Sequence, residues 1–258
     1  MDFQIKDQLF IVGGASSGFG SAIAKTLLQE GAHIIAIARS ADKLAELSAM
    51  APNQVTTVAG DLTNVELSTK IIAAIGNRSL HGVLVNAGGP PAKTFMETSL
   101  EDWDNAYNSL LRWKVNLTKA LLPLMQEKQY GRILYIESSS VKQPLENLVL
   151  SNSLRLAVVG FVKTLSQEIA STGITLNIMA PGSHDTPAIQ RVYNKKAEQA
   201  GISAQEARSR GIQQIPVGRL GNAADFASLA CWLLSPGAGY ITGQTITVDG
   251  GTVKSIFG

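Results

Sequence analysis

The chain has 258 residues, with 22 lysines and arginines against 20 aspartates and glutamates. The formal net charge of +2 excludes binding by bulk attraction to nucleic acid or to an anionic membrane. The single cysteine, Cys231, excludes an internal disulfide framework. No basic leader followed by an apolar core and no apolar run of ~20 residues is present. The composition therefore predicts a soluble, cytoplasmic protein.

Short apolar or β-branched runs alternate with longer helical stretches along the chain. The runs are continuous rather than alternating, which is typical of parallel strands covered on both faces. Strands are expected over residues 9–12, 34–38, 55–59, 83–85, 133–136, 174–179 and 245–248. Helices are expected over residues 18–30, 42–50, 64–75, 100–128, 151–171 and 222–234. This alternation predicts an α/β fold in a single domain over residues 1–258, with a doubly wound parallel sheet of about seven strands and helices on both faces.

Residues 187–214 interrupt the regular alternation of strands and helices. They are polar, helix-prone and rich in Lys, Arg, Glu and Gln, and they follow an expected strand and a Pro-Gly turn. Long insertions after the carboxyl end of a strand in such sheets often close over the ligand crevice. We expect a substrate lid here; the alternative is a pair of solvated surface helices.

A glycine-rich loop follows the first expected strand and opens the first expected helix. Its spacing is Gly-x-x-x-Gly-x-Gly, and its members are Gly14, Ser16, Ser17, Gly18, Phe19 and Gly20. Glycine lets the backbone approach a pyrophosphate with no Cβ atom in the way. The helix N-terminus then offers free N–H donors and the positive end of the helix dipole. In this strand-to-helix context the loop predicts dinucleotide binding.

The end of the second expected strand tests which dinucleotide binds. An Asp or Glu about 20 residues after the glycines would bind the ribose 2′-hydroxyl of NAD. The residues at this point are Ala38, Arg39 and Ser40, and none is acidic. The Arg39 guanidinium can pair with a 2′-phosphate, so we expect NADP(H) as the cofactor. The alternative is that Arg39 is a surface charge before a helix.

Further motifs resemble the short-chain dehydrogenase/reductase family, and the resemblance covers essentially the whole chain. They are Gly60-Asp61-Leu62, Asn86-Ala87-Gly88, Pro181-Gly182 with Thr186, and residues 217–221 and 241–251. The C-terminal motifs are most similar to reductases of the 3-oxoacyl-acyl-carrier-protein type. The resemblance implies a Rossmann fold, Asp61 at the adenine and Thr186 at the nicotinamide amide. It also adds the rest of these motifs to the expected cofactor site: Leu62, Asn86, Ala87, Gly88, Pro181 and Gly182.

The family's catalytic positions can be placed on this chain. In the family a Tyr transfers the proton, a Lys four residues later lowers the pKa of that Tyr and holds the ribose, and a Ser thirteen residues earlier polarises the carbonyl. Gly160 and Phe161 correspond to the pair five residues after the Lys. The Lys position is then Arg155, the Tyr position is Ser151, and the Ser is Ser138. The serine is kept, and the tyrosine and lysine are replaced.

The fourth catalytic position, an Asn that holds a water, is replaced as well. The family spacing after Trp103 and before Gly131 places this position at Leu110. Asn116 lies six residues further along the expected helix, about 9 Å away and off the relevant face.

These replacements change the available chemistry. Ser151 is shorter than tyrosine and a weaker acid, and Arg155 stays charged, so it can hold a ribose or an oxyanion but cannot shuttle protons. Lys142 follows Ser138 by four residues, and desolvation near Arg155 would lower its pKa and make it a proton donor. The alternative is that Lys142 is an exposed loop residue. His184, in the turn before Thr186, is a lesser acid/base candidate.

Two functions stay open. The first is an NADP(H)-dependent oxidoreductase that reduces a small-molecule carbonyl or oxidises an alcohol through an altered proton relay. The second is a non-catalytic NADP(H)-binding protein, a sensor or an assembly subunit. No metal site is expected, because no Cys/His/Asp/Glu cluster has ligand spacing. We expect neither nucleic acid nor membrane as a partner, and the resemblance suggests a homotetramer or homodimer built on residues 100–128 and 151–171.

Overall fold

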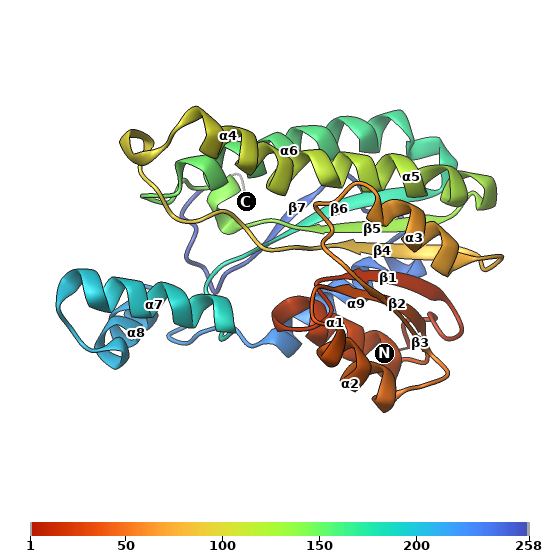
Figure 1. Cartoon of the computed structure of the whole chain (residues 1–258), viewed down its shortest axis with the longest axis horizontal. Coiled ribbons are helices and arrows are strands. Elements are labelled where there is room, and N and C mark those ends of the chain that lie inside the picture. Colours follow the sequence, from red (N-terminus) through yellow and green to blue (C-terminus); the bar gives the residue numbers. More distant parts are fainter. Residues whose placement is uncertain (1, 257–258) are drawn as a thin grey trace.

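The computed structural model describes residues 2–256 and contains one seven-stranded sheet in which all the paired strands run parallel. The strand order is β3-β2-β1-β4-β5-β6-β7, so the direction of winding reverses between β1 and β4 (Figure 1). The strands are β1 (Leu9–Gly13), β2 (His33–Ala38), β3 (Val55–Ala59), β4 (Leu80–Val85), β5 (Gly131–Ile136), β6 (Ile174–Pro181) and β7 (Thr245–Val248). The expected doubly wound Rossmann fold is confirmed, and ligands of such sheets bind outside the carboxyl ends of the strands at the reversal point.

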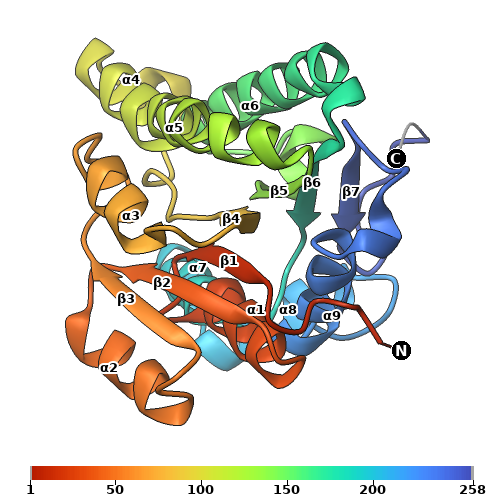
Figure 2. The ribbon, with the colours of Figure 1, turned by 90° about the vertical axis from the view of Figure 1, so that its right-hand side faces the viewer.

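Helices cover both faces of the sheet, as Figure 2 shows by separating the two layers. One layer holds α1 (Gly18–Gln29), α2 (Ala41–Met50) and α9 (Ala223–Leu233). The other holds α3 (Leu67–Ile75), α4 (Leu100–Tyr107), α5 (Trp113–Lys128) and α6 (Val149–Glu168). Among residues 2–256, no helix is long and apolar enough to cross a membrane.

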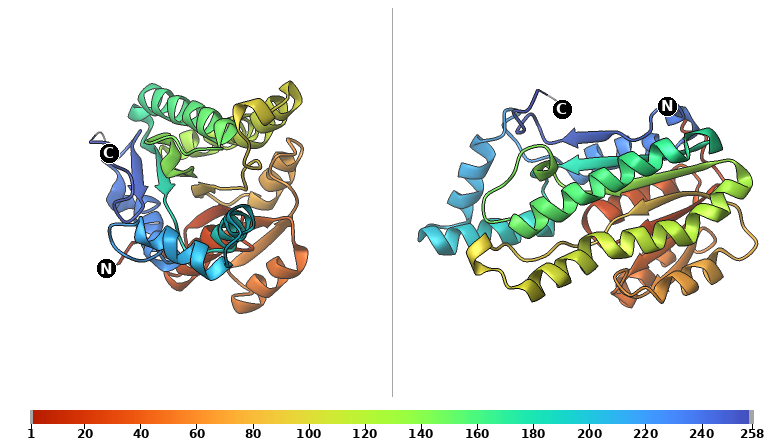
Figure 3. Two further views of the ribbon diagram at one scale, coloured as in Figure 1. Left: turned by 90° about the vertical axis from the view of Figure 1, so that its left-hand side faces the viewer. Right: turned by 90° about the horizontal axis from the view of Figure 1, so that it is seen from above.

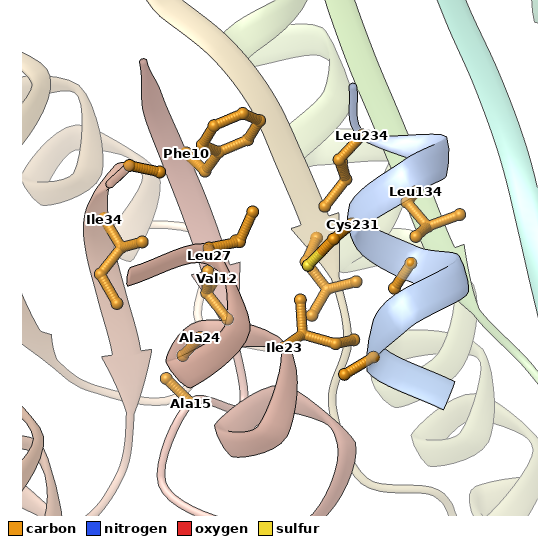
Figure 4. Close-up of a cluster of buried hydrophobic side chains, with 14 of the residues drawn as sticks. Phe10, Val12, Ala15, Ile23, Ala24, Leu27, Ile34, Leu134, Cys231 and Leu234 are labelled. Carbon is orange, nitrogen blue, oxygen red and sulfur yellow. The ribbon is translucent and has the colours of Figure 1, made fainter. Parts of the chain in front are cut away.

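The sheet is buried because side chains of successive residues point to opposite faces and both sets are apolar. In β1, Phe10 and Val12 pack against α1 and α9, together with the buried Cys231 (Figure 4). Leu9 and Ile11 pack on the other face with the side chains of α3, α5 and α6. The strands therefore have apolar neighbours on both sides, and their carboxyl ends are held as a rigid edge.

The helix expected over residues 100–128 contains an irregular turn. Between α4 and α5, residues Asn108–Arg112 form a π-helical turn. Leu110 lies within this turn and is 1% exposed. The next residue after the turn, Trp113, is also buried, and its Nε1 donates to the Ser109 carbonyl oxygen at 2.8 Å. Such turns accommodate an extra residue within a helix and occur frequently at functional sites.

Residues 187–214 form two helices, α7 (Pro187–Ala200) and α8 (Ala204–Gln213), called the helix pair below. Gly201 ends α7 with a φ of +63°, a conformation that favours glycine. The Ser203 side chain accepts a hydrogen bond from the Glu206 N–H and caps α8. The helix pair has an apolar cluster of its own, Tyr193, Ala197, Ala207, Ile215 and Leu220. It lies beyond the carboxyl ends of the strands (Figure 1) and in front of them in the end-on view of Figure 3.

Candidate functional site

The glycine-rich turn after β1 combines a strained backbone with open space. Gly14 and Gly18 have φ values of +66° and +55°, a region that residues with a Cβ atom rarely adopt. An added Cβ atom on Gly14 would lie 2.7 Å from Asn86 Nδ2. On Gly18 or Gly88, by contrast, it would meet no atom within 4 Å. The residues present therefore fit a bulky group such as a pyrophosphate, because Gly18 and Gly88 have no side chain where the structure leaves open space.

The start of α1 faces the same space. Ser17 has an extended backbone and its side chain makes no capping hydrogen bond. The N–H groups of the first helical turn therefore remain available to an anion. Gly20 allows α1 to approach the turn, since its Cβ atom would lie 2.6 Å from the carbonyl carbon of Gly14. Ser16 is partly buried within the turn.

Arg39 and Asp61 lie at the ends of β2 and β3. Arg39 is exposed, and Ser40 caps α2, with its Oγ 3.4 Å from the Lys43 N–H. The Asp61 carboxylate accepts hydrogen bonds from the backbone N–H and the hydroxyl of Thr63, at 2.9 and 2.8 Å. The backbone bond from Thr63, together with its hydroxyl and the charge of Arg39, lowers the pKa of Asp61. The structure thus brings an exposed guanidinium near a charged carboxylate where the resemblance places the adenosine.

The motif after β4 ties two strands together. Asn86 Nδ2 donates to the Gly13 carbonyl oxygen at 3.3 Å, which links the ends of β4 and β1. Leu62 lies against the same point, with its Cδ1 3.0 Å from a Cβ atom built on Gly13. Ala87 is partly buried against the core, and Gly88 leaves space open above it.

The turn after β6 is closely packed. Pro181 ends β6, and Gly182 has no room for a side chain, because a Cβ atom would lie 2.6 Å from Asp249 Cβ. Thr186 precedes the first residue of α7, and its hydroxyl is 3.4 Å from the His184 carbonyl oxygen. The predicted nicotinamide-amide residue therefore stands at the base of the helix pair.

His184 joins two of these turns. Its Nδ1 donates to the Gly182 carbonyl oxygen at 3.1 Å, and its ring packs edge-on against Phe19 and Phe226, at 5.0 and 5.4 Å between centroids. Burial lowers the pKa of His184, which is 3% exposed. The neutral ring thus connects the glycine-rich turn to the turn after β6 through packing.

The residues that the sequence places at the family's catalytic positions lie just after β5 and in the first two turns of α6. Ser138 Oγ accepts a hydrogen bond from the Ser140 N–H at 3.1 Å. Ser151 and Arg155 lie one turn apart on α6, and Arg155 Nε donates to Ser151 Oγ at 3.0 Å. Lys142 is partly exposed and ends the short 3₁₀ turn that follows Ser138.

Two further charges, which the sequence reasoning missed, lie beside these residues. Glu137 comes directly before Ser138, and its side chain is fully buried. It binds Arg155 Nη1 through Oε2 at 2.9 Å, and it forms an ion pair with Lys114 Nζ through Oε1. The Lys114 and Arg155 side chains are 3% and 12% exposed. Lys114, Glu137 and Arg155 are called the charged triad below.

A sequence signal for the triad did exist. Glu137 stands directly after a buried apolar strand, where a carboxylate needs a partner. Lys114 follows Leu110 by four residues and precedes Leu117 by three, which puts it on the apolar side of its helix. What the sequence lacks is any indication that these charges meet, because they lie on separate elements.

The triad holds two cations and one carboxylate away from water. Burial is the main cause that lowers the pKa of Lys114, and the charge of Arg155 lowers it further, while Glu137 opposes both. The other edge of the guanidinium faces the loop after β4, since Arg155 Nη2 lies 2.9 Å from a Cβ atom built on Gly89. Arg155 therefore connects the buried charges to the expected cofactor space. Across residues 2–256, no group of three or more His, Cys, Asp or Glu side chains is placed to hold a metal ion.

Comparison with known proteins agrees with this geometry. Residues 14–253 match the family model described as enoyl-(acyl carrier protein) reductase. The 3-oxoacyl-acyl-carrier-protein reductase FabG of Escherichia coli is 33% identical over 257 residues, which cover 97% of this chain and 98% of that protein. The NADPH and L-sorbose complex of L-sorbose reductase from Gluconobacter frateurii has a TM-score of 0.92 and 28% identity, and covers 99% of this chain and 100% of that chain. YwfH, an NADPH-dependent reductase involved in bacilysin biosynthesis, has a TM-score of 0.91 and 28% identity over 97% of this chain and 100% of that chain. With its Rossmann sheet, glycine-rich turn and full-length similarity, the chain belongs to the short-chain dehydrogenase/reductase family of NAD(P)-dependent oxidoreductases.

Proposed function

We propose that the protein is an NADP(H)-dependent oxidoreductase that reduces a small-molecule carbonyl or oxidises the corresponding alcohol. The observation that carries this proposal is the open space at Gly18 and Gly88 in the turns after β1 and β4, with an exposed arginine, Arg39, after the neighbouring strand β2. An arginine without a competing carboxylate on its own turn favours a 2′-phosphate over a free ribose hydroxyl. Two structurally similar reductases are described with NADPH, which supports the same choice.

The chain's own residues would hold the cofactor along the strand ends. The N–H groups at the start of α1 would bind the pyrophosphate, Asp61 would contact the adenine, and Thr186, before α7, would contact the nicotinamide amide. Arg155, whose Nη2 lies beside Gly89, would hold the ribose next to the nicotinamide. NADPH, when bound, supplies a hydride to the substrate carbonyl carbon.

Proton supply must then come from groups other than tyrosine. Ser138 donates a hydrogen bond to the carbonyl oxygen, and Ser151, whose Oγ accepts from Arg155, keeps its own hydrogen free to do the same. As the carbonyl π pair moves onto oxygen, the Lys142 ammonium group gives up one proton to that oxygen and regains one from water. Arg155 stays charged throughout and stabilises the developing negative charge.

The helix pair α7–α8 acts as the substrate lid of this single-domain enzyme. It begins at Thr186, beside the proposed nicotinamide site, and has its own small core, so it can move as a unit. Lys195 on α7 lies close enough to Glu97, in the segment before α4, for its charge to lower the pKa of Glu97, after the larger effect of the backbone and hydroxyl bonds from Thr94.

A second copy of the chain is the expected partner. Leu100 and Tyr107 on α4 and Leu156 on α6 are 85%, 46% and 53% exposed, and they lie on two helices of the same layer (Figure 2). A homodimer or homotetramer would cover them. Light scattering on the purified protein tests this, and a monomer at micromolar concentration contradicts it.

One observation favours the non-catalytic alternative. Arg155 is bound on two sides by Glu137 and Ser151, and a guanidinium cannot release a proton at neutral pH. A protein with this arrangement could bind NADP(H) and perform no turnover.

The deciding experiment measures NADPH affinity by fluorescence and then NADPH oxidation against ketones, ketoses and 3-oxoacyl thioesters. We expect turnover with at least one class, about 100-fold or more slower in Lys142→Ala and in Ser138→Ala. Ser140→Ala is the matched control, since Ser140 binds Ser138 through its backbone N–H, which the substitution keeps. Binding without turnover on any substrate supports the non-catalytic alternative, and an unchanged rate in Lys142→Ala removes Lys142 as the proton donor.

A further inference from the structure

We propose that Glu137 is a positioning residue that clamps the Arg155 guanidinium toward the cofactor, with Lys114 as its buried counter-cation. This inference rests on the proposed function, in which Arg155 holds the ribose next to the nicotinamide. It assigns a role to two residues outside the family's four catalytic positions.

Two hydrogen bonds fix the plane of the guanidinium. Nη1 donates to Glu137 Oε2 at 2.9 Å, and Nε donates to Ser151 Oγ at 3.0 Å. A guanidinium is planar, so two bonds to different nitrogens determine where the third points. The third, Nη2, points at Gly89, where the absence of a side chain leaves it room. Glu137 therefore sets the direction in which Arg155 meets a bound ribose.

Lys114 is the second partner of the buried Glu137 carboxylate, on the oxygen that Arg155 does not bind. A carboxylate with no exposed surface is costly unless it is paired on both oxygens. Arg155 engages one oxygen and Lys114 the other, so neither oxygen is left without a partner.

A purely structural ion cluster would look the same in a static structure, but it would respond differently to substitution. If Glu137 only stabilises the fold, its effect on NADPH affinity does not depend on Arg155. If Glu137 acts through Arg155, removing Arg155 first abolishes the effect. A double-mutant cycle separates the two cases.

The cycle is measured in a Lys114→Met background, so that loss of Glu137 does not leave a buried lysine unpaired. The four proteins are Lys114→Met alone and this variant combined with Glu137→Gln, with Arg155→Met, or with both. NADPH dissociation constants are measured by fluorescence, and urea unfolding confirms that each protein is folded. Glu146→Gln, at an exposed glutamate, is the matched control.

We expect Glu137→Gln to weaken NADPH binding about tenfold or more while Arg155 is present, the usual value of a charged hydrogen bond. After Arg155→Met, the same change should alter affinity less than about twofold. An equal effect in both backgrounds, or no effect in either, overturns the positioning role and leaves the ribose contact of Arg155 intact.

If the proposed ribose contact of Arg155 is wrong, the NADPH affinities of the same variants show a different pattern. If Arg155→Met alone leaves NADPH affinity unchanged, Arg155 does not hold the ribose, and the positioning role falls with it. Glu137→Asp in the otherwise unchanged chain gives a second test, since it keeps the charge beside Lys114 and withdraws the carboxylate by one methylene. We expect this variant to fold and to bind NADPH more weakly; unaltered affinity contradicts the clamp.

Discussion

At the carboxyl ends of β1 and β4 the site is lined by backbone and small side chains, whereas after β5 and on α6 it is lined by buried charges. The first region depends on Gly14, Gly18 and Gly88, where a Cβ atom would be strained or would fill open space. The second depends on Glu137, which binds two cations at once. The expected nucleotide site thus follows from local chain geometry, while the region around Ser138, Ser151 and Arg155 depends on contacts between distant elements.

The largest effect is expected when the carboxylate of the charged triad is removed, because this tests whether the second region depends on Glu137. Glu137→Leu leaves Lys114 and Arg155 as buried cations without a counter-ion. Losing one partner of a buried ion pair typically costs about 3–5 kcal/mol, so we expect that loss in the free energy of unfolding measured in urea. The double variant Lys114→Met/Glu137→Gln should lose much less. Wild-type stability in Glu137→Leu would show that the triad is solvated.

The glycine-rich turn should respond differently at its two strained positions. Gly14→Ala places a Cβ atom 2.7 Å from Asn86. It also puts alanine in the left-handed region of φ, which costs about 1–2 kcal/mol. Gly18→Ala has only this conformational cost, because its Cβ atom enters open space. We expect Gly14→Ala to lower the thermal midpoint more than Gly18→Ala does, while both weaken NADPH binding. Equal midpoints, or unchanged affinity in Gly18→Ala, would count against a ligand in that space.

Arg39 tests the chemistry of the nucleotide region. Arg39→Ala should weaken NADPH binding by about tenfold or more, since it removes a charged hydrogen bond to the 2′-phosphate. NADH binding should stay the same, and Lys43→Ala, on the exposed side of α2, is the control. Competition titrations with the two nucleotides measure the ratio. An equal loss for both would make Arg39 a general surface charge.

The smallest effect concerns pH. Burial lowers the pKa of Lys114 below its ordinary value of 10.5. Between the lowered pKa and 10.5, the folded protein therefore binds fewer protons than the unfolded chain. The free energy of unfolding should rise with pH across this range, because Lys114 loses the charge that is costly to bury. Urea midpoints across this alkaline range should show the rise in the wild type. Lys114→Met should remove it; the same slope in both proteins contradicts a lowered pKa.

The fold and the nucleotide region were predictable because their signals are local. Continuous apolar runs indicated the strands, and the glycine spacing lies within seven residues, Gly14 to Gly20. The triad was not predictable, because α5, the residue after β5 and α6 each contribute one charge, and only the packed fold brings them together. The π-helical turn was missed as well, since its residues read as ordinary helix.

That π-helical turn, Asn108–Arg112, determines the angular register of everything after it. One extra residue rotates α5 by about 100° around its axis relative to a continuous α-helix. In the observed register Lys114 meets Glu137, and Asn116 Nδ2 lies 3.5 Å from the Val65 carbonyl oxygen near α3. Deleting one residue from the turn would swing Lys114 away from the carboxylate without changing any member of the triad. The triad therefore depends both on which three charged residues are present and on the number of residues in the helix that carries Lys114.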